Sequence, residues 1–124
     1  MATILVVDDD AMLRGFTARM LHTLGYQVTE AVDGEEGERL ALSRQPDLIL
    51  LDIMMPNQNG WETCQRLRAQ GFMRPIFLMS AFLPGYTSAK IQTAGATAFI
   101  EKPITRVILQ KHFQSVGQSQ ASSG

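Results

Sequence analysis

The stretch that decides the fold is Leu48-Ile49-Leu50-Leu51-Asp52. Four consecutive large aliphatic residues are typical of a strand buried on both faces, as an interior strand of a parallel sheet is. Asp52 follows them directly, so its carboxylate is expected at the edge of the sheet where the strand ends. Ligands of open α/β sheets bind outside the carboxyl ends of the strands. A lone aspartate there could equally end the strand and cap the next turn of the chain, and the other residues have to decide between these two interpretations.

The composition predicts one domain and fits a reducing compartment. The chain has 124 residues, a net charge of -1 and one cysteine, Cys64. This length fits a single domain, the charge offers no basic surface to nucleic acid or an acidic membrane, and no internal disulfide can form. The first residues lack the basic and apolar parts of a signal peptide, and no apolar run approaches the about 20 residues that cross a bilayer. We therefore expect a soluble cytoplasmic domain.

Short apolar runs alternate with segments of helical periodicity along the whole chain. Strands are expected at 4–7, 27–31, 48–51, 76–79 and 97–100, and helices at 13–24, between 33 and 46, at 61–69, at 87–93 and at 104–113. This alternation implies right-handed crossovers and a parallel sheet, so we predict a doubly wound α/β fold with five strands and five helices. The first strand–helix turn carries acids in place of a glycine fingerprint, which argues against a Rossmann-type dinucleotide site.

Several local signals add detail to this prediction. Asp10 and Asp33 are expected to cap the helices that begin after them. Gly37 lies in the first turn of its helix, and this turn is expected to fray because glycine is a poor helix former. Pro84 and Gly85 predict a loop at 82–86, which would delay or distort the fourth helix. The polar residues 117–124 are expected to be a flexible tail or the stub of a linker.

Polar side chains come directly after four of the five predicted strands. They are Asp8, Asp9 and Asp10 after the first strand, Asp52 after the third, Ser80 after the fourth and Lys102 after the fifth. In a parallel sheet these strand ends share one edge, so the side chains are expected to converge. Carboxylates at close range repel one another, and either a raised pKa or a bound cation relieves this. Oxygen ligands without nearby His or Cys favour Mg²⁺.

The remaining groups at this edge suit an anion. A lysine and a hydroxyl that face a cation site can hold a group rich in oxygens. Carboxylates, Mg²⁺, Lys102 and Ser80 together make a site for phosphoryl transfer, in which positioning and charge neutralisation supply most of the catalysis. The central Asp52 would then act as the nucleophile and form an aspartyl phosphate.

Four motifs carry a resemblance to a known family. They are Val6-Val7-Asp8-Asp9-Asp10, Asp52-x-x-Met55-Pro56-x-x-x-Gly60, Ser80-Ala81 and Lys102-Pro103. In this order, each at a predicted strand end, they resemble the CheY-like receiver domain of response regulators in two-component and phosphorelay signalling systems. The resemblance runs from about residue 4 to residue 113, and we set the domain at 1–116. It implies a flavodoxin-like sheet with strand order 2-1-3-4-5.

The resemblance implies roles for the acids. Asp52 would be the phosphoacceptor and would take its phosphoryl group from a phosphohistidine of a histidine kinase or a histidine phosphotransfer protein. Mg²⁺, for which Mn²⁺ can substitute, would be bound by Asp9, by Asp52 and by the backbone carbonyl of Met54. Asp8 would act through water.

The resemblance also implies a switch. Ser80 would bond a phosphoryl oxygen, and Lys102 would pair with the phosphoryl charge, with a cis peptide bond between Lys102 and Pro103. Phe99 stands where receivers keep an aromatic residue that rotates as the hydroxyl residue moves, although it could equally be plain core. Phosphorylation would thereby change the face formed by the fourth helix, the fifth strand and the fifth helix, to which a downstream effector protein or output domain binds.

Two other functions compete with this interpretation. A Mg²⁺-dependent phosphohydrolase could use Asp52 covalently, but no second acid stands two residues after it and no cap for a substrate is evident. A pseudo-receiver could serve only as an interaction scaffold, but all five key positions are filled. We therefore expect no enzyme beyond the chain's own phosphorylation and autodephosphorylation, no direct nucleic acid binding and no membrane partner.

Overall fold

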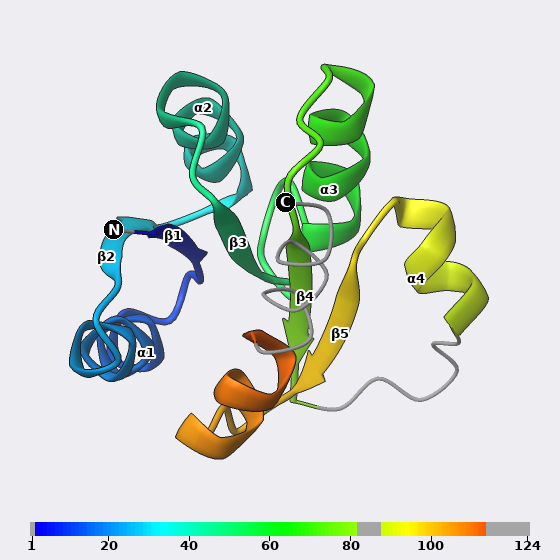
Figure 1. Cartoon of the computed structure of the whole chain (residues 1–124). Helices are drawn as coiled ribbons and strands as arrows, with labels where there is room; N and C mark the ends of the chain where they lie inside the picture. Colours follow the sequence, from blue (N-terminus) through cyan, green and yellow to red (C-terminus); the bar gives the residue numbers. More distant parts are fainter. Residues whose placement is uncertain (1, 82–87, 114–124) are drawn as a thin grey trace, which may run out of the picture.

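The computed structural model describes residues 2–81 and 88–113, which form a five-stranded parallel sheet with helices on both faces (Figure 1). The elements are β1 (Thr3–Val7), α1 (Ala11–Thr23), β2 (Gln27–Ala31), α2 (Gly34–Arg44), β3 (Leu48–Asp52), α3 (Gly60–Ala69), β4 (Ile76–Ser80), α4 (Ser88–Ala94) and β5 (Ala98–Glu101). Residues 106–113 form a further helix. Each predicted strand is found with its ends displaced by at most one residue. The predicted loop at 82–86 and the predicted tail at 117–124 lie outside the described residues.

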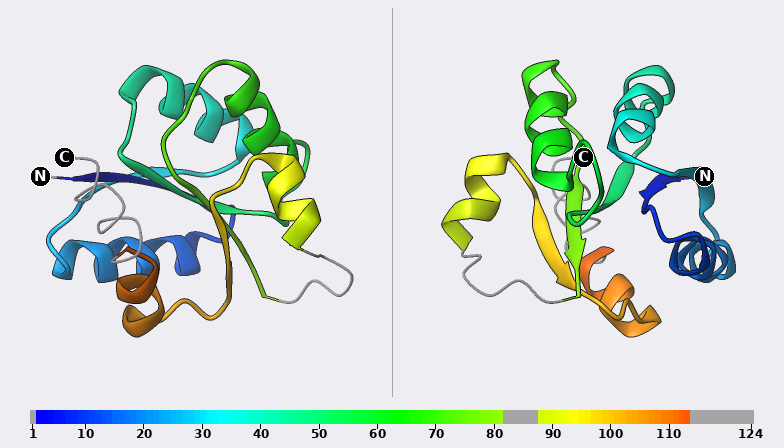
Figure 2. Two further views of the ribbon diagram at one scale, coloured as in Figure 1. Left: turned by 45° about the vertical axis from the view of Figure 1, so that its right-hand side comes forward. Right: turned by 180° about the vertical axis from the view of Figure 1, so that it is seen from behind.

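The strand order is β2-β1-β3-β4-β5, which confirms the doubly wound fold (Figure 1). Helix α1 and the helix at 106–113 cover one face of the sheet, and α2, α3 and α4 cover the other (Figure 2). Alternate side chains of β3 enter different cores, because Ile49 and Leu51 pack on the α2 and α3 side while Leu48 and Leu50 pack on the α1 side. An interior strand with helices on both faces needs an unbroken aliphatic run. Among the described helices, none is both long and apolar enough to cross a membrane.

The register of the sheet brings the strand ends to one edge. Val7 pairs with Leu51 across β1 and β3, and Asp52 pairs with Met79 across β3 and β4. Ser80 pairs with Glu101 across β4 and β5. The residues immediately after these strands therefore lie beside one another, as the parallel topology predicts.

Side-chain caps start the helices that leave this edge. Asp10 caps α1 and Asp33 caps α2 by accepting hydrogen bonds from backbone N–H groups in the first turn, as predicted. Asn59 and Glu62 form a capping box at the start of α3, which the sequence pattern did not reveal. These caps satisfy N–H groups that have no partner inside a helix.

Gly37 serves close packing in α2, and the predicted fraying of the first turn stays a prediction. Helix α2 is helical from Gly34 to Arg44, and Gly37 is buried within it. A Cβ atom at this position would lie 2.8 Å from a methyl carbon of Val7. Glycine therefore lets α2 lie directly against the end of β1, and this packing outweighs the poor helix propensity of the residue.

Candidate functional site

Three carboxylates meet at the carboxyl edge of the sheet. Asp8, Asp9 and Asp52 each place one oxygen within 4.8 Å of the others. Asp8 and Asp52 are buried, with 2% and 5% exposure, whereas Asp9 is exposed. Asp10 lies beside them in sequence but accepts hydrogen bonds from Met12 and Leu13 in α1, so it caps a helix as predicted. The cluster combines buried oxygen donors with one side open to water, an arrangement that suits a partly hydrated Mg²⁺ ion.

Lys102 provides the positive charge next to this cluster. Its Nζ atom lies 2.9 Å from Oδ2 of Asp8 and 3.5 Å from Oδ1 of Asp52. The backbone N–H of Lys102 donates to the carbonyl of Ser80 at 2.7 Å, which holds the end of β5 against the end of β4. The peptide bond between Lys102 and Pro103 is cis, as the resemblance implied.

Negative charge is in excess among Asp8, Asp9, Asp52 and Lys102. Burial raises the pKa of Asp52 from 3.8 to about 6; Lys102 opposes this rise, and the negative charges of Asp8 and Asp9 add to it. Burial disfavours the charged form of Lys102, but its contacts with Asp8 and Asp52 outweigh that effect and raise its pKa. Three carboxylates face one ammonium group among these residues. A divalent cation would relieve the excess negative charge.

The other predicted site residues surround this centre. Ser80 is buried at the end of β4, in the strand next to Asp52. Met54 comes two residues after Asp52, and its side chain is 64% exposed. Phe99 in β5 is half-buried and packs against the core on the α2 and α3 side, which fits a core residue, and its predicted rotation stays a prediction.

Sequence reasoning did not identify Arg14. Its Nη1 atom donates to the backbone carbonyl of Asp8 at 2.9 Å, and its Nε atom donates to Glu30 at 3.0 Å. Arg14 of α1 therefore links the residue after β1 to β2. The only signal in the sequence is its place one helical turn after Asp10, and this spacing is too common to point to a site.

An apolar groove of about 300 Å³ lies beside Lys102. Its lining residues come from α1, from the position after β4 and from the segment after β5: Leu13, Phe16, Thr17, Ala81, Lys102, Pro103 and Ile104. Leu13 and Phe16 belong to the apolar pattern that predicted α1, yet they are 44% and 52% exposed. These two side chains line the groove beside Lys102 and do not belong to either core cluster.

Comparison with known proteins adds a family to this geometry. The family model of the response regulator receiver domain matches residues 4–114. The chain belongs to this family. Among curated relatives, the DNA-binding dual master transcriptional regulator RpaA of Synechocystis sp. is 39% identical over 105 residues, which cover 83% of this chain and 44% of RpaA. The alkaline phosphatase synthesis transcriptional regulatory protein PhoP of Bacillus subtilis is 37% identical over 102 residues, which cover 82% of this chain and 42% of PhoP.

Solved structures agree with the fold. The chemotaxis protein CheY4 of Vibrio cholerae matches with a TM-score of 0.86 and 30% identity over 94% of this receiver domain and 98% of CheY4. A CheY-like receiver domain protein of Methanospirillum hungatei matches with a TM-score of 0.90 and 26% identity over 100% and 99% of the two chains. The chain thus matches these two solved chains over nearly their full length, whereas it spans less than half of RpaA and PhoP.

Proposed function

We propose that this receiver domain is a phosphoacceptor module that takes a phosphoryl group onto Asp52 from a phosphohistidine of a histidine kinase or a histidine phosphotransfer protein. The observation that carries the proposal is a buried Asp52 between two further acids and a lysine at the carboxyl edge of the sheet. In the transfer, an oxygen of Asp52 bonds to phosphorus while the phosphorus–nitrogen bond of the donor breaks, and the electron pair stays on the imidazole. A pKa of about 6 leaves Asp52 mostly ionised at neutral pH, as a nucleophile must be.

The acidic cluster fits Mg²⁺, or Mn²⁺ in its place. Asp9, Asp52 and the backbone carbonyl of Met54 would hold the ion, and Asp8 would act through water. The ion, when bound, neutralises negative charge on the carboxylates and on the oxygens of the phosphoryl group. The open side at Asp9 leaves room for water and for the donor.

The remaining site residues would contact the phosphoryl group and respond to it. Lys102 is placed to exchange part of its contact with Asp52 for a phosphoryl oxygen, and the hydroxyl of Ser80 would bond another. Phe99 would then follow Ser80 and change the face formed by α4, β5 and the helix at 106–113. This switch shifts the population between two packings of one fold.

The partner that binds the face formed by α4, β5 and the helix at 106–113 would be a downstream effector protein or an output domain. RpaA and PhoP are named as transcriptional regulators, and their length beyond the matched region leaves room for an output domain. We propose that the receiver domain itself makes no contact with nucleic acid or membrane. Its location in the cytoplasm stays a prediction from the sequence.

Intact-protein mass after incubation with acetyl phosphate tests the proposal. The wild type is expected to gain one phosphoryl group only with Mg²⁺, and Asp52→Asn is expected to gain none. Asp10→Asn is the matched control, because it makes the same change in an acid that follows β1 outside the cluster, and asparagine keeps a capping oxygen for α1. If the wild type forms neither a phosphoryl adduct nor a beryllofluoride complex, the result would support a function as an interaction scaffold only. Turnover of a small phosphate ester would instead indicate a phosphohydrolase.

A further inference from the structure

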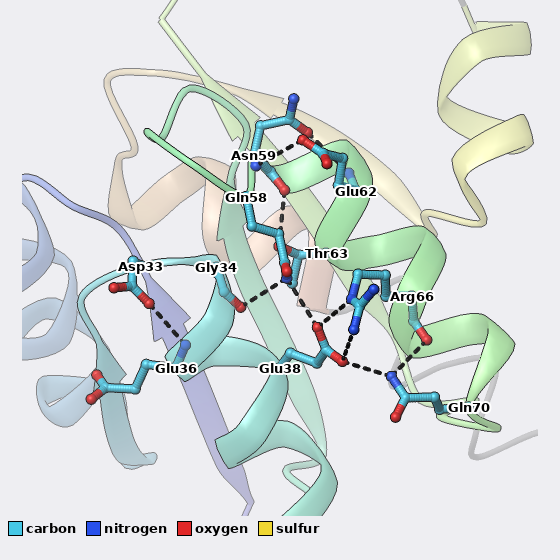
Figure 3. A network of polar contacts seen from close by, with 10 residues as sticks. All are labelled: Asp33, Gly34, Glu36, Glu38, Gln58, Asn59, Glu62, Thr63, Arg66 and Gln70. Carbon is cyan, nitrogen blue, oxygen red and sulfur yellow. Dashed lines mark hydrogen bonds and ion pairs between the residues drawn. The ribbon is translucent and has the colours of Figure 1, made fainter.

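A polar network joins α2 to the loop that precedes α3 (Figure 3). Gln58, half-buried in that loop, is its central residue. Its side-chain nitrogen lies 3.2 Å from the carbonyl oxygen of Gly34, 3.0 Å from Oε1 of Glu38 and 3.0 Å from the hydroxyl of Thr63. The hydroxyl of Thr63 in turn donates to the carbonyl of Asn59 at 2.8 Å. One amide group thus joins the start of α2, the loop and the start of α3.

Glu38 holds the other end of this network. Its carboxylate accepts hydrogen bonds from Nε of Arg66 at 2.7 Å, from Nη2 of Arg66 at 3.2 Å and from Gln70 at 2.8 Å, all in α3 or at its end. The contact with Arg66 outweighs burial and lowers the pKa of Glu38. The carboxylate is therefore a charged, fixed acceptor for Gln58, and hydrogen bonds to charged groups are stronger than neutral ones.

The loop held by Gln58 is in direct backbone contact with the phosphoacceptor. A Cβ atom on Gly34 would collide with the carbonyl oxygen of Gln58, and one on Gly60 would collide with the carbonyl oxygen of Asp52. The N–H of Gly60 donates to the carbonyl of Ile53 at 2.9 Å. Backbone thus packs closely on backbone at both ends of the loop, at Gly34 against Gln58 and at Gly60 against Asp52.

We propose that Gln58 is a positioning residue for the metal site: its hydrogen bonds to Glu38 and Gly34 hold the loop so that the carbonyl of Met54 and the carboxylate of Asp52 face one ion. This inference rests on the proposed function and adds to it a group that touches neither metal nor phosphate. Replacing a group that hydrogen-bonds to a metal ligand lowers metal affinity by about 10–100-fold. Gln58 acts one step further away, through the backbone of the loop, so we expect an effect at the lower end of this range.

The test compares two variants of the same network. Gln58→Met keeps the length of the side chain and removes its N–H donors, whereas Gln70→Ala removes a hydrogen bond to Glu38 on the side away from the loop. Mg²⁺ titration followed by the fluorescence of Trp61, the single tryptophan, reports affinity near the loop. We expect the Kd for Mg²⁺ to rise about tenfold in Gln58→Met and by no more than about twofold in Gln70→Ala. The rate of phosphorylation by acetyl phosphate should recover in Gln58→Met at saturating Mg²⁺.

Urea denaturation of each variant separates positioning from folding. A purely structural role would lower the stability of both variants and leave the Kd of the folded protein unchanged, which would overturn the inference. If Gln58→Met does not fold, Glu38→Ala removes the same acceptor from outside the loop, and an unchanged Kd there would overturn the inference as well. Wild-type protein that neither binds Mg²⁺ nor takes a phosphoryl group would instead refute the proposed function, and the inference with it.

Discussion

Replacing Asp52 by asparagine is expected to stabilise the metal-free receiver domain. Burial and the neighbouring acids raise the pKa of Asp52 from 3.8 to about 6. A raised pKa for an acid means that the folded state binds its proton more tightly than the unfolded state does. The free energy of unfolding of the wild type therefore falls as pH rises between these two values. The decrease is complete above the pKa of the folded state. Asparagine has the same shape but does not ionise, so the stability of the Asp52→Asn variant does not fall in this way.

The size of the effect is set by the shift in pKa. About two pKa units correspond to about 3 kcal/mol in the free energy of unfolding. The linkage relation gives an advantage for Asp52→Asn of about 1 kcal/mol at about pH 4.5 and about 3 kcal/mol at about pH 7.5. Because Lys102 keeps its 2.9 Å contact with Asp8, the variant does not leave an unpaired ammonium.

Urea denaturation at both pH values with a chelator measures this difference. Asp10→Asn serves as the control, since it removes an acid outside the cluster and is expected to change stability by well under about 1 kcal/mol at about pH 7.5. Added Mg²⁺ should stabilise the wild type and remove the advantage of Asp52→Asn, because only the wild type keeps the full set of ligands. An advantage that is equal at both pH values, or a variant less stable than the wild type at about pH 7.5, would refute the reasoning.

Three further predictions concern Lys102, Gly37 and Cys64. Lys102→Ala is expected to lower the free energy of unfolding by about 3 kcal/mol in chemical denaturation, because Asp8 is left buried without its partner; no loss would contradict the ion pair. Gly37→Ala, measured in the same way, is expected to cost about 2 kcal/mol although alanine favours helices, because its methyl group would press on Val7. Cys64 is buried, and burial raises its pKa to about 11, so a thiol reagent should label it only in denaturant; rapid labelling of the native protein would disprove this.

The sequence determined the architecture because its signals are local and repeat along the chain. The aliphatic runs of β1, β3 and β4 can be buried only in a sheet covered on both faces, and the alternating helices require parallel strands. Parallel strands have their carboxyl ends at one edge. This is why Lys102 and Asp8 could be predicted to meet although 94 positions separate them. The caps at Asp10 and Asp33 depend only on their own first turns, so they could be predicted too.

Other contacts were decided by the tertiary structure. The exposure of Phe16, the packing of Gly37 on Val7 and the contact of Arg14 with the carbonyl of Asp8 depend on where and at what angle each helix packs on the sheet. Only 20 positions separate Gln58 from Glu38, yet nothing in the sequence pattern predicted their hydrogen bond. Helical periodicity tells which face of a helix is apolar, but it does not specify how two helices on the same face of a sheet are rotated toward each other. That rotation is set by side-chain packing across the whole layer, so the polar network between α2 and α3 exists only once the fold is complete.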